Sequence, residues 1–269
     1  MSKRRPFSYR TGGEAEYIGS EVNLEKWLLP VMMFTELSSP LYSRSLECAQ
    51  ESEASALELP GSVELETLHS SAHSKLKRLI DIVGAVVGLG IAAIVAVPVA
   101  IAIQRDNPGP IFYSQIRCGV KGNPFRIWKF RSMVADAEQR KHLVENQAKG
   151  NIFKNENDPR ITRVGAFLRR TSLDELPQFW NVLKGEMSLV GTRPPTLDEV
   201  NKYQPHHWTR LKVKPGMTGE WQVNGRSSVI DFEDVVKLDV AYQQKWSIAY
   251  DLKLILSTIE VVFKKRGAC

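Results

Sequence analysis

One segment of the chain constrains its fold more than any other. From Ile82 to Ile103 the sequence runs for 22 residues without a charge. An apolar helix of about 20 residues is long enough to cross the hydrocarbon core of a bilayer, which is roughly 30 Å thick. The run therefore predicts a helix that enters a membrane.

A proline and the flanking charges constrain how this helix meets the membrane. Pro98 lies inside the run and removes a helical hydrogen bond, so we expect a break or kink there. Basic residues lie on both sides of the run, for example Lys77 before it and Arg105 after it. Because basic flanks tend to stay in the cytoplasm, this pattern favours a re-entrant helix over residues 73–105 that leaves on the side it entered. A single transmembrane span is the alternative.

The apolar run also separates two parts of opposite charge. Residues 1–72 contain 6 Lys/Arg and 11 Glu, a net charge of −5, and show no sustained hydrophobic period, which is typical of a disordered acidic tail. An apolar stretch at 27–34 is a candidate docking helix within it. The remaining residues contain 30 Lys/Arg and 19 Asp/Glu, a net charge of +11. A basic body suggests a phosphate-bearing partner: nucleic acid, a nucleotide or an anionic membrane.

Residues 106–269 have the pattern of a compact α+β domain that is mostly helical. Short β-like pieces at 111–113 and 125–128 flank turns rich in glycine and proline, which predicts a small β element. Helical periodicity predicts helices at 132–148, 173–183, 194–203, 232–244 and 250–263.

Two adjacent carboxylates are the first candidates for chemistry. Ser172 followed by Glu175 matches a capping box, so a helix should begin at Leu173. The simplest interpretation is that Asp174 and Glu175 are acids in a first turn, where the helix dipole favours the ionised form. In the functional alternative, one carboxylate attacks or abstracts while the other holds a divalent cation. Arg169 and Arg170, just upstream, would then neutralise a diphosphate.

Two other groups carry positive charge near turns. Lys129 and Arg131 are two residues apart and share a strand face, in a segment that is either a phosphate site or a basic hairpin on lipid headgroups. Arg193 lies at a turn into a helix, a place suited to phosphate. The adjacent His206 and His207 have no third ligand at metal spacing and are a weak zinc signal.

These groups, in this order behind one proline-containing apolar segment, closely resemble the bacterial sugar transferase family, the monotopic phosphoglycosyl transferases. The resemblance runs from about Lys75 to the C-terminus. It rests on KFRSM at 129–133, DPRITRVG at 158–165, LRRTSLDELPQFWNVLKGEMSLVG at 168–191 and KPGMTGEWQVNGR at 214–226. The family moves a hexose-1-phosphate from a UDP-sugar to polyprenyl (undecaprenyl) phosphate, which initiates exopolysaccharide, capsule or O-antigen synthesis. It is Mg²⁺-dependent and works at the cytoplasmic face of the bacterial inner membrane.

The resemblance implies roles for individual residues. Asp174 would attack the sugar-bearing phosphorus, UMP would leave, and Asp174 and Glu175 would hold Mg²⁺. The phosphates would be bound by basic side chains, namely Lys129 and Arg193 with support from Arg131, Arg169 and Arg170.

The resemblance also bears on the membrane segment. It favours the re-entrant form, and it implies that amphipathic helices such as 250–263, followed by Lys264 and Lys265, lie on membrane lipid. Val97-Pro98 stands where the family usually has Ser-Pro. Gly84-xxx-Gly88 matches a packing motif that permits a homodimer through the membrane helix.

Two other function classes compete with this interpretation. A catalytically silent membrane scaffold for polysaccharide assembly would use the same basic body, but it has no need for Asp174, Glu175 and Arg193 together. Nucleic-acid binding rests only on the charge of the body, and the apolar run argues against it.

Overall fold

The computed structural model describes residues 67–224 and 229–263. The predicted acidic tail, except for residues 67–72, lies outside the described residues, as do its candidate docking helix and the basic residues Lys264 and Lys265. The chain is followed here from the short helix α3 (Ser70–His73) onward.

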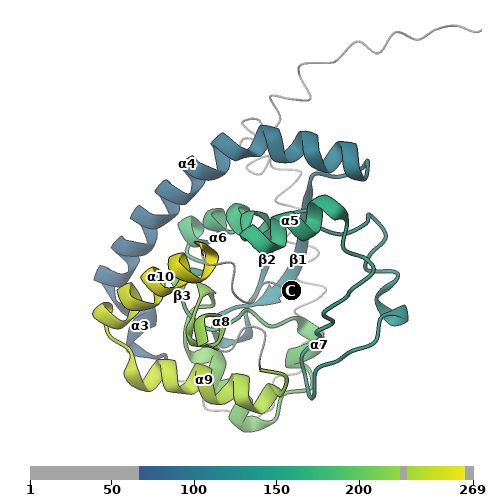
Figure 1. Ribbon diagram of the computed structural model, residues 1–269. Helices are drawn as coiled ribbons and strands as arrows, with labels where there is room; N and C mark the ends of the chain where they lie inside the picture. The colour runs from purple at the N-terminus through teal and green to yellow at the C-terminus, as the bar shows by residue number, and fades with distance from the viewer. Residues whose placement is uncertain (1–66, 225–228, 264–269) are drawn as a thin grey trace, which may run out of the picture.

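The apolar run forms one long helix, α4 (Lys75–Asp106), that lies across the folded body (Figure 1). Among the described residues it is the one helix long and apolar enough to cross a membrane, with a mean hydropathy of 2.7 over its most apolar 18 residues. Figure 1 shows that α4 curves around the body. Of the expected break or kink at Pro98, the break does not occur, because the helix continues through Pro98 without separating into two. The re-entrant course of this segment stays a prediction.

The two faces of α4 differ in side-chain size. The face toward the body is made of small residues, such as Ala85, Gly88 and Ala92. The opposite face exposes large aliphatic side chains, and Ile94 is 78% exposed. These side chains recur every three or four residues and therefore form one continuous apolar surface. They are Leu76, Leu79, Ile82, Val83, Val86, Val87, Ile91, Ile94 and Val97.

Two glycines let the body approach α4 closely. A Cβ on Gly84 would lie 2.5 Å from a methyl carbon of Leu189, and a Cβ on Gly88 would lie 2.4 Å from the ring of Phe179. The Gly84-xxx-Gly88 motif is therefore occupied by packing within the chain. The homodimer that the motif was expected to permit stays a prediction.

Buried polar contacts fix the first turns of α4 to the body. Lys77 Nζ lies 2.6 Å from a carboxylate oxygen of Asp251, and both side chains are almost fully buried. Arg78 donates hydrogen bonds to the carbonyl oxygens of Val182 and Leu183, at 2.7 and 2.6 Å. The start of α4 therefore belongs to the protein body and not to a separate anchor.

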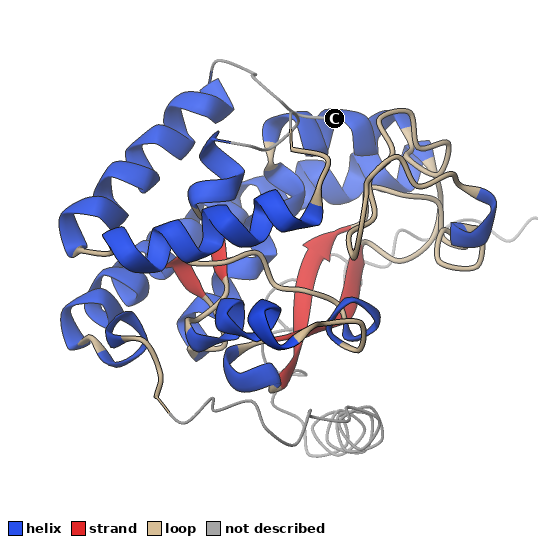
Figure 2. Ribbon diagram, turned by 90° about the horizontal axis from the view of Figure 1, so that it is seen from below, coloured by secondary structure: helices blue, strands red, loops and turns tan. Residues whose placement is uncertain are grey.

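The predicted β element is an antiparallel hairpin of β1 (Phe112–Cys118) and β2 (Pro124–Phe130). Both strands are longer than the sequence indicates. A second sheet pairs β3 (Ser188–Val190) with β4 (Gly216–Thr218) in parallel, and Figure 2 shows the two sheets apart from one another.

Helices surround both sheets, and most are short. The mostly helical α+β class is confirmed. The remaining helical segments are η2 (Val120–Gly122), η3 (Lys141–Leu143), α5 (Arg163–Thr171), η4 (Leu173–Gln178), α6 (Phe179–Lys184), α7 (Leu197–Val200), η5 (Pro205–Lys212), α8 (Glu220–Asn224), α9 (Phe232–Lys245) and α10 (Ile248–Phe263).

The helix predictions succeed in the C-terminal part and at 173–183, which η4 and α6 together cover. Only α7 forms within the predicted helix at 194–203. Helices α9 and α10 confirm the predictions at 232–244 and 250–263. The predicted helix at 132–148 is wrong, because turns replace all of it except η3. The Asn146 side chain bonds the backbone N–H groups of Ala148 and Lys154 and the carbonyl of Ile152, so it stabilises a loop in place of a helix.

Candidate active site

The Asp-Glu pair lies on η4, at a sharp turn after α5. Helical structure begins at Leu173 as predicted, but it is a 3₁₀ helix. Ser172 ends α5 in a left-handed conformation, with φ of 56°, and forms no side-chain cap. The predicted capping box is therefore wrong, because Ser172 closes one helix in a conformation that cannot cap the next.

Asp174 is buried and has one oxygen without a partner. The residue is only 5% exposed, and its Oδ1 has no hydrogen-bond partner among the described residues. Burial raises the pKa of the Asp174 carboxyl, while the positive charges of Lys129 and Arg169 act to lower it. The raised pKa is opposite in direction to the effect of a helix N-terminus, because desolvation outweighs the dipole.

A lysine from the hairpin lies beside this pair. Lys129 Nζ donates a hydrogen bond of 2.7 Å to Glu175 Oε1. The contact joins β2 to η4 across 46 residues of sequence. A cation is thus already placed next to the two carboxylates, as phosphate chemistry at an acidic site requires.

The four predicted arginines have different surroundings. Arg169 donates to Ser132 Oγ at 3.0 Å. Arg131 donates to the side chain of Asn107 at 2.9 Å and also to its backbone carbonyl, so it fastens the C-terminal cap of α4. Arg170 is exposed and lies outside the cavity that the other site residues share. Successive helical residues point about 100° apart, which separates it from Arg169.

Arg193 is held by a carboxylate and an aromatic ring. Its Nη1 lies 3.0 Å from Glu199 Oε2, and the guanidinium carbon is 6.0 Å from the centre of the Trp221 ring. Glu199 also takes part in the capping box with Thr196 at the start of α7. Charge and position therefore keep Arg193 in one orientation at the edge of the cavity.

One cavity of about 660 Å³ brings most of the predicted residues together. Its walls also include much of the loop from 133 to 155. This volume suits a ligand larger than a single sugar. The predicted residues on its walls are Asp174, Glu175, Lys129, Arg131, Arg169 and Arg193.

The cavity has further walls that sequence reasoning missed. Tyr113 and Arg117 line it from β1, Trp221 from α8, and the buried pair Asp158–Arg160 from the loop before α5. The alternation of Tyr113 and Arg117 along a strand was a usable signal, since residues at even spacing share a face. Trp221 lies within the motif KPGMTGEWQVNGR, but no spacing in the sequence places it at the cavity.

The Asp-Glu pair has the chemistry of a magnesium site. Mg²⁺ prefers hard oxygen ligands, usually one or two carboxylates with waters and substrate phosphates completing its shell. The unpartnered Asp174 Oδ1 and the adjacent Glu175 carboxylate supply such oxygens at the wall of a polar cavity. The residues present fit the ion.

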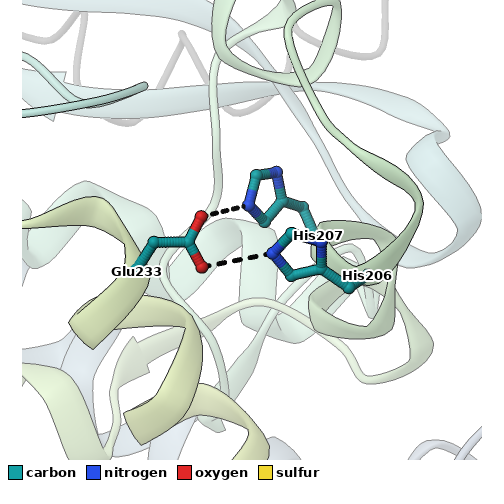
Figure 3. A group of neighbouring side chains, drawn as sticks. All are labelled: His206, His207 and Glu233. Carbon is teal, nitrogen blue, oxygen red and sulfur yellow. Dashed lines mark hydrogen bonds and ion pairs between the residues drawn. The ribbon is translucent and has the colours of Figure 1, made fainter.

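A second cluster, His206, His207 and Glu233, joins η5 to α9 outside this cavity (Figure 3). The carboxylate accepts from His207 Nε2 at 2.8 Å and lies 3.1 Å from His206 Nε2. His207 Nδ1 accepts the backbone N–H of Gln204 at 3.0 Å. In neutral His207 the ring proton is therefore on Nε2, which then has no lone pair to bind a metal. The cluster is better explained as a link between two helices.

Comparison with known proteins identifies the family. The family model described as "Bacterial sugar transferase" matches residues 72–265. This chain belongs to the bacterial sugar transferase family. The motifs that carried the resemblance contain the cavity residues Asp174, Glu175, Lys129 and Arg169.

Curated relatives of this sugar transferase have closely related names. A galactosyl transferase CpsE of Streptococcus agalactiae is 54% identical over 73% of this chain and 44% of its own length. The UDP-glucose:undecaprenyl-phosphate glucose-1-phosphate transferase of Escherichia coli is 40% identical over 76% of this chain and 43% of its own length. The exopolysaccharide production protein ExoY of Rhizobium meliloti is 36% identical over 71% of this chain and 87% of its own length. The chain thus spans less than half the length of the first two and most of the third.

Proposed function

We propose that this protein is a phosphoglycosyl transferase that moves a hexose-1-phosphate from a UDP-sugar to polyprenyl phosphate and releases UMP. The observation that carries the proposal is the buried Asp174, with one unpartnered oxygen, beside the Lys129–Glu175 pair in a cavity rich in arginine. The names of the relatives from Escherichia coli and Streptococcus agalactiae support the reaction class.

The first half of the reaction forms a covalent intermediate on Asp174. An Asp174 oxygen attacks the sugar-bearing phosphorus, the bond from that phosphorus to the UMP oxygen breaks, and UMP leaves with the electron pair. The sugar phosphate is then held as an acyl phosphate. Lys129 and Arg169 offset the negative charge that builds up on the phosphoryl oxygens.

The second half transfers the sugar phosphate to lipid. A phosphate oxygen of polyprenyl phosphate attacks the same phosphorus, and the bond to Asp174 breaks. The products are a polyprenyl diphosphate sugar and the free Asp174 carboxylate. Asp174 and Glu175 would hold Mg²⁺, which neutralises charge on the diphosphate when bound.

The packing of α4 supports attachment to one leaflet, and the leaflet that we propose is the cytoplasmic one. Contacts with the body run along the helix from Lys77, which pairs with Asp251, to Ile103, which packs with Phe130 and Leu168. A helix crossing the bilayer would draw the polar body into the lipid, at a high cost for each buried charge. The aliphatic outer face of α4 and the exposed Leu256 of α10 supply an apolar surface for one leaflet instead.

Release of UMP tests the proposal. The full chain in nanodiscs would receive undecaprenyl phosphate, Mg²⁺ and separately UDP-glucose, UDP-galactose and UDP-N-acetylhexosamines, with Asp174→Asn as the control. We expect UMP with one donor and none from the control. Label from the sugar should remain on the wild-type protein when the acceptor is omitted. Release of UDP in place of UMP would overturn the proposal. No release of UMP with any donor would also overturn it and would favour the scaffold.

A further inference from the structure

Arg117 is a half-buried cation on the wall of the active-site cavity that the proposed mechanism does not use. It lies on β1, where Tyr113, Gln115 and Arg117 alternate along one face and all line the cavity. The guanidinium donates to the carbonyl of Pro194 at 3.1 Å and to the side chain of Gln115 at 2.8 Å. Its Nε has no partner among the described residues, although it is buried.

The charge around Arg117 is not balanced. The nearest anion that acts on it is Glu199, which is already bound by both oxygens to Arg193. Two arginines therefore share one carboxylate, and no ion pair of Arg117 occurs in the described part of the chain. Burial and the charge of Arg193 lower the pKa of Arg117 to about 10. A desolvated cation without an anionic partner is costly, and an anionic ligand would reduce that cost.

The position of Arg117 separates it from the reacting carboxylate. Tyr113 pairs with Lys129 across the hairpin, and Arg117 is four residues further along β1, roughly 13 Å along the strand. Lys129 contacts the Asp-Glu pair, and Arg117 contacts the Arg193 turn. The two cations thus reach different parts of one elongated cavity.

The two ends of the cavity, at Asp174 and at Arg117, also differ in what lies next to them. Leu173 and Leu176 of η4 pack with Ile103 of α4, so the Asp174 side adjoins the apolar helix. Arg117 lies instead near the C-terminal end of β1, the end opposite the connection from α4, and Figure 1 shows α7, which follows the Arg193 turn, on the side of the body away from α4. A soluble nucleotide has access there, while a lipid phosphate would have to leave the membrane side.

We infer that Arg117 and Arg193 together form a phosphate subsite for the nucleotide, which holds the phosphate that departs as UMP. The inference rests on the proposed function and adds to it a second cationic centre, distinct from Lys129 and Arg169. One centre binds the phosphorus under attack and the other binds the leaving phosphate.

Calorimetric titration of UMP and of uridine into the full chain in nanodiscs tests the inference. We expect Arg117→Gln to weaken UMP binding by about tenfold or more and to leave uridine binding unchanged, because only the phosphate contact is lost. Arg126→Gln is the matched control. Arg126 is on the paired strand, also has a buried unpartnered Nε, donates to Ser114 at 3.1 Å and does not line the cavity. It should not change UMP affinity.

The outcomes separate the two proposals. If Arg117→Gln binds UMP as tightly as the wild type does, the subsite is overturned and the proposed function is not. A raised KM for undecaprenyl phosphate with unchanged UMP affinity would assign Arg117 to the lipid phosphate and also overturn it. A wild type that neither binds nor releases UMP would overturn both proposals. If Arg117→Gln does not fold, Arg117→Lys replaces it. Lysine keeps the positive charge but lacks the paired N–H donors of the guanidinium group, so we expect about threefold weaker UMP binding. Unchanged UMP binding in this variant would refute the inference.

Discussion

Asp174, the proposed nucleophile, is held at a cost to stability. It is buried, one oxygen lacks a hydrogen bond, and Glu175 adds a second negative charge next to it. Lys129 and Arg169 compensate in part. The result is a carboxylate that is poorly solvated and directed at a cavity, which is the state a nucleophile needs before its substrate arrives.

Replacing Asp174 by Asn should abolish transfer without lowering thermal stability. The folded pKa of Asp174 is raised, so the ionised carboxylate costs stability above that pKa, and the cost disappears as the pH falls through it. The melting temperature of Asp174→Asn should therefore equal or exceed that of the wild type by a few degrees at pH 8, with a smaller gain at acid pH. A large decrease at pH 8 would show that Asp174 supports the fold.

Lys129 should set the acid limb of the pH–rate profile. Its charge lowers the pKa of Asp174, so Lys129→Gln removes that effect and raises the pKa further. The rate falls when Asp174 is protonated, so the acid limb of kcat/KM should move to higher pH in the variant. An acid limb at unchanged pH, with only a lower maximum, would mean that Lys129 acts on substrate alone.

At the scale of elements, α4 illustrates how small residues decide the packing of a membrane-associated helix. Gly84 and Gly88 face Leu189 and Phe179, while Gly90 faces open space, with no heavy atom within 4 Å of an added Cβ. The three glycines look equivalent in the sequence. Only the docked body distinguishes them.

The pair Gly88→Ala and Gly90→Ala tests this packing. An added methyl at Gly88 meets the Phe179 ring and should destabilise the protein by about 1–3 kcal/mol. At Gly90 the added methyl meets no neighbour, and alanine has a higher helix propensity than glycine. Gly90→Ala should therefore be neutral or stabilise the protein by up to about 1 kcal/mol. Thermal unfolding of both variants in nanodiscs gives the comparison. Equal effects would contradict the close approach at Gly88.

Local sequence signals predicted some elements and failed at others for identifiable reasons. The apolar run, the hairpin and α9 follow from periodicity and turn residues within each segment. The segment 132–148 has helical periodicity, yet Asn146 bonds three backbone groups of a loop. Ser172 and Glu175 have the spacing of a capping box, yet the left-handed Ser172 cannot form it.

The site was predictable to a similar extent. Six of the seven predicted active-site side chains line one cavity. Five of them lie in the motifs that resemble a known family, and Arg193 follows one of these motifs by two residues. Arg170 does not, since it points away from Arg169 on α5. Arg117 could have been found from its alternation with Tyr113 along one strand face. Trp221 reaches the cavity through helix packing between distant segments, and no local pattern reports that contact.

On the scale of the whole molecule, the proposed attachment to one leaflet places both ends of α4 on the same side of the membrane. Lys75 and Arg105 are exposed at these ends. Single cysteines at the two positions, in a background without Cys48, Cys118 and Cys269, should react with a membrane-impermeant maleimide in inverted vesicles and not in intact cells. Labelling of one end from each side would establish a transmembrane span.

The contacts at the two ends of α4 have a consequence for how substrates meet. Lys77 and Arg78 hold its beginning, and Arg131 holds its cap at Asn107, so the apolar helix and the proposed nucleophile Asp174 form a single rigid unit. In the proposed attachment to one leaflet, the distance between Asp174 and the lipid surface is therefore fixed by the fold. A polyprenyl phosphate acceptor would then have to reach that depth by lateral diffusion, and tail length beyond the first few isoprene units would have no part in aligning it.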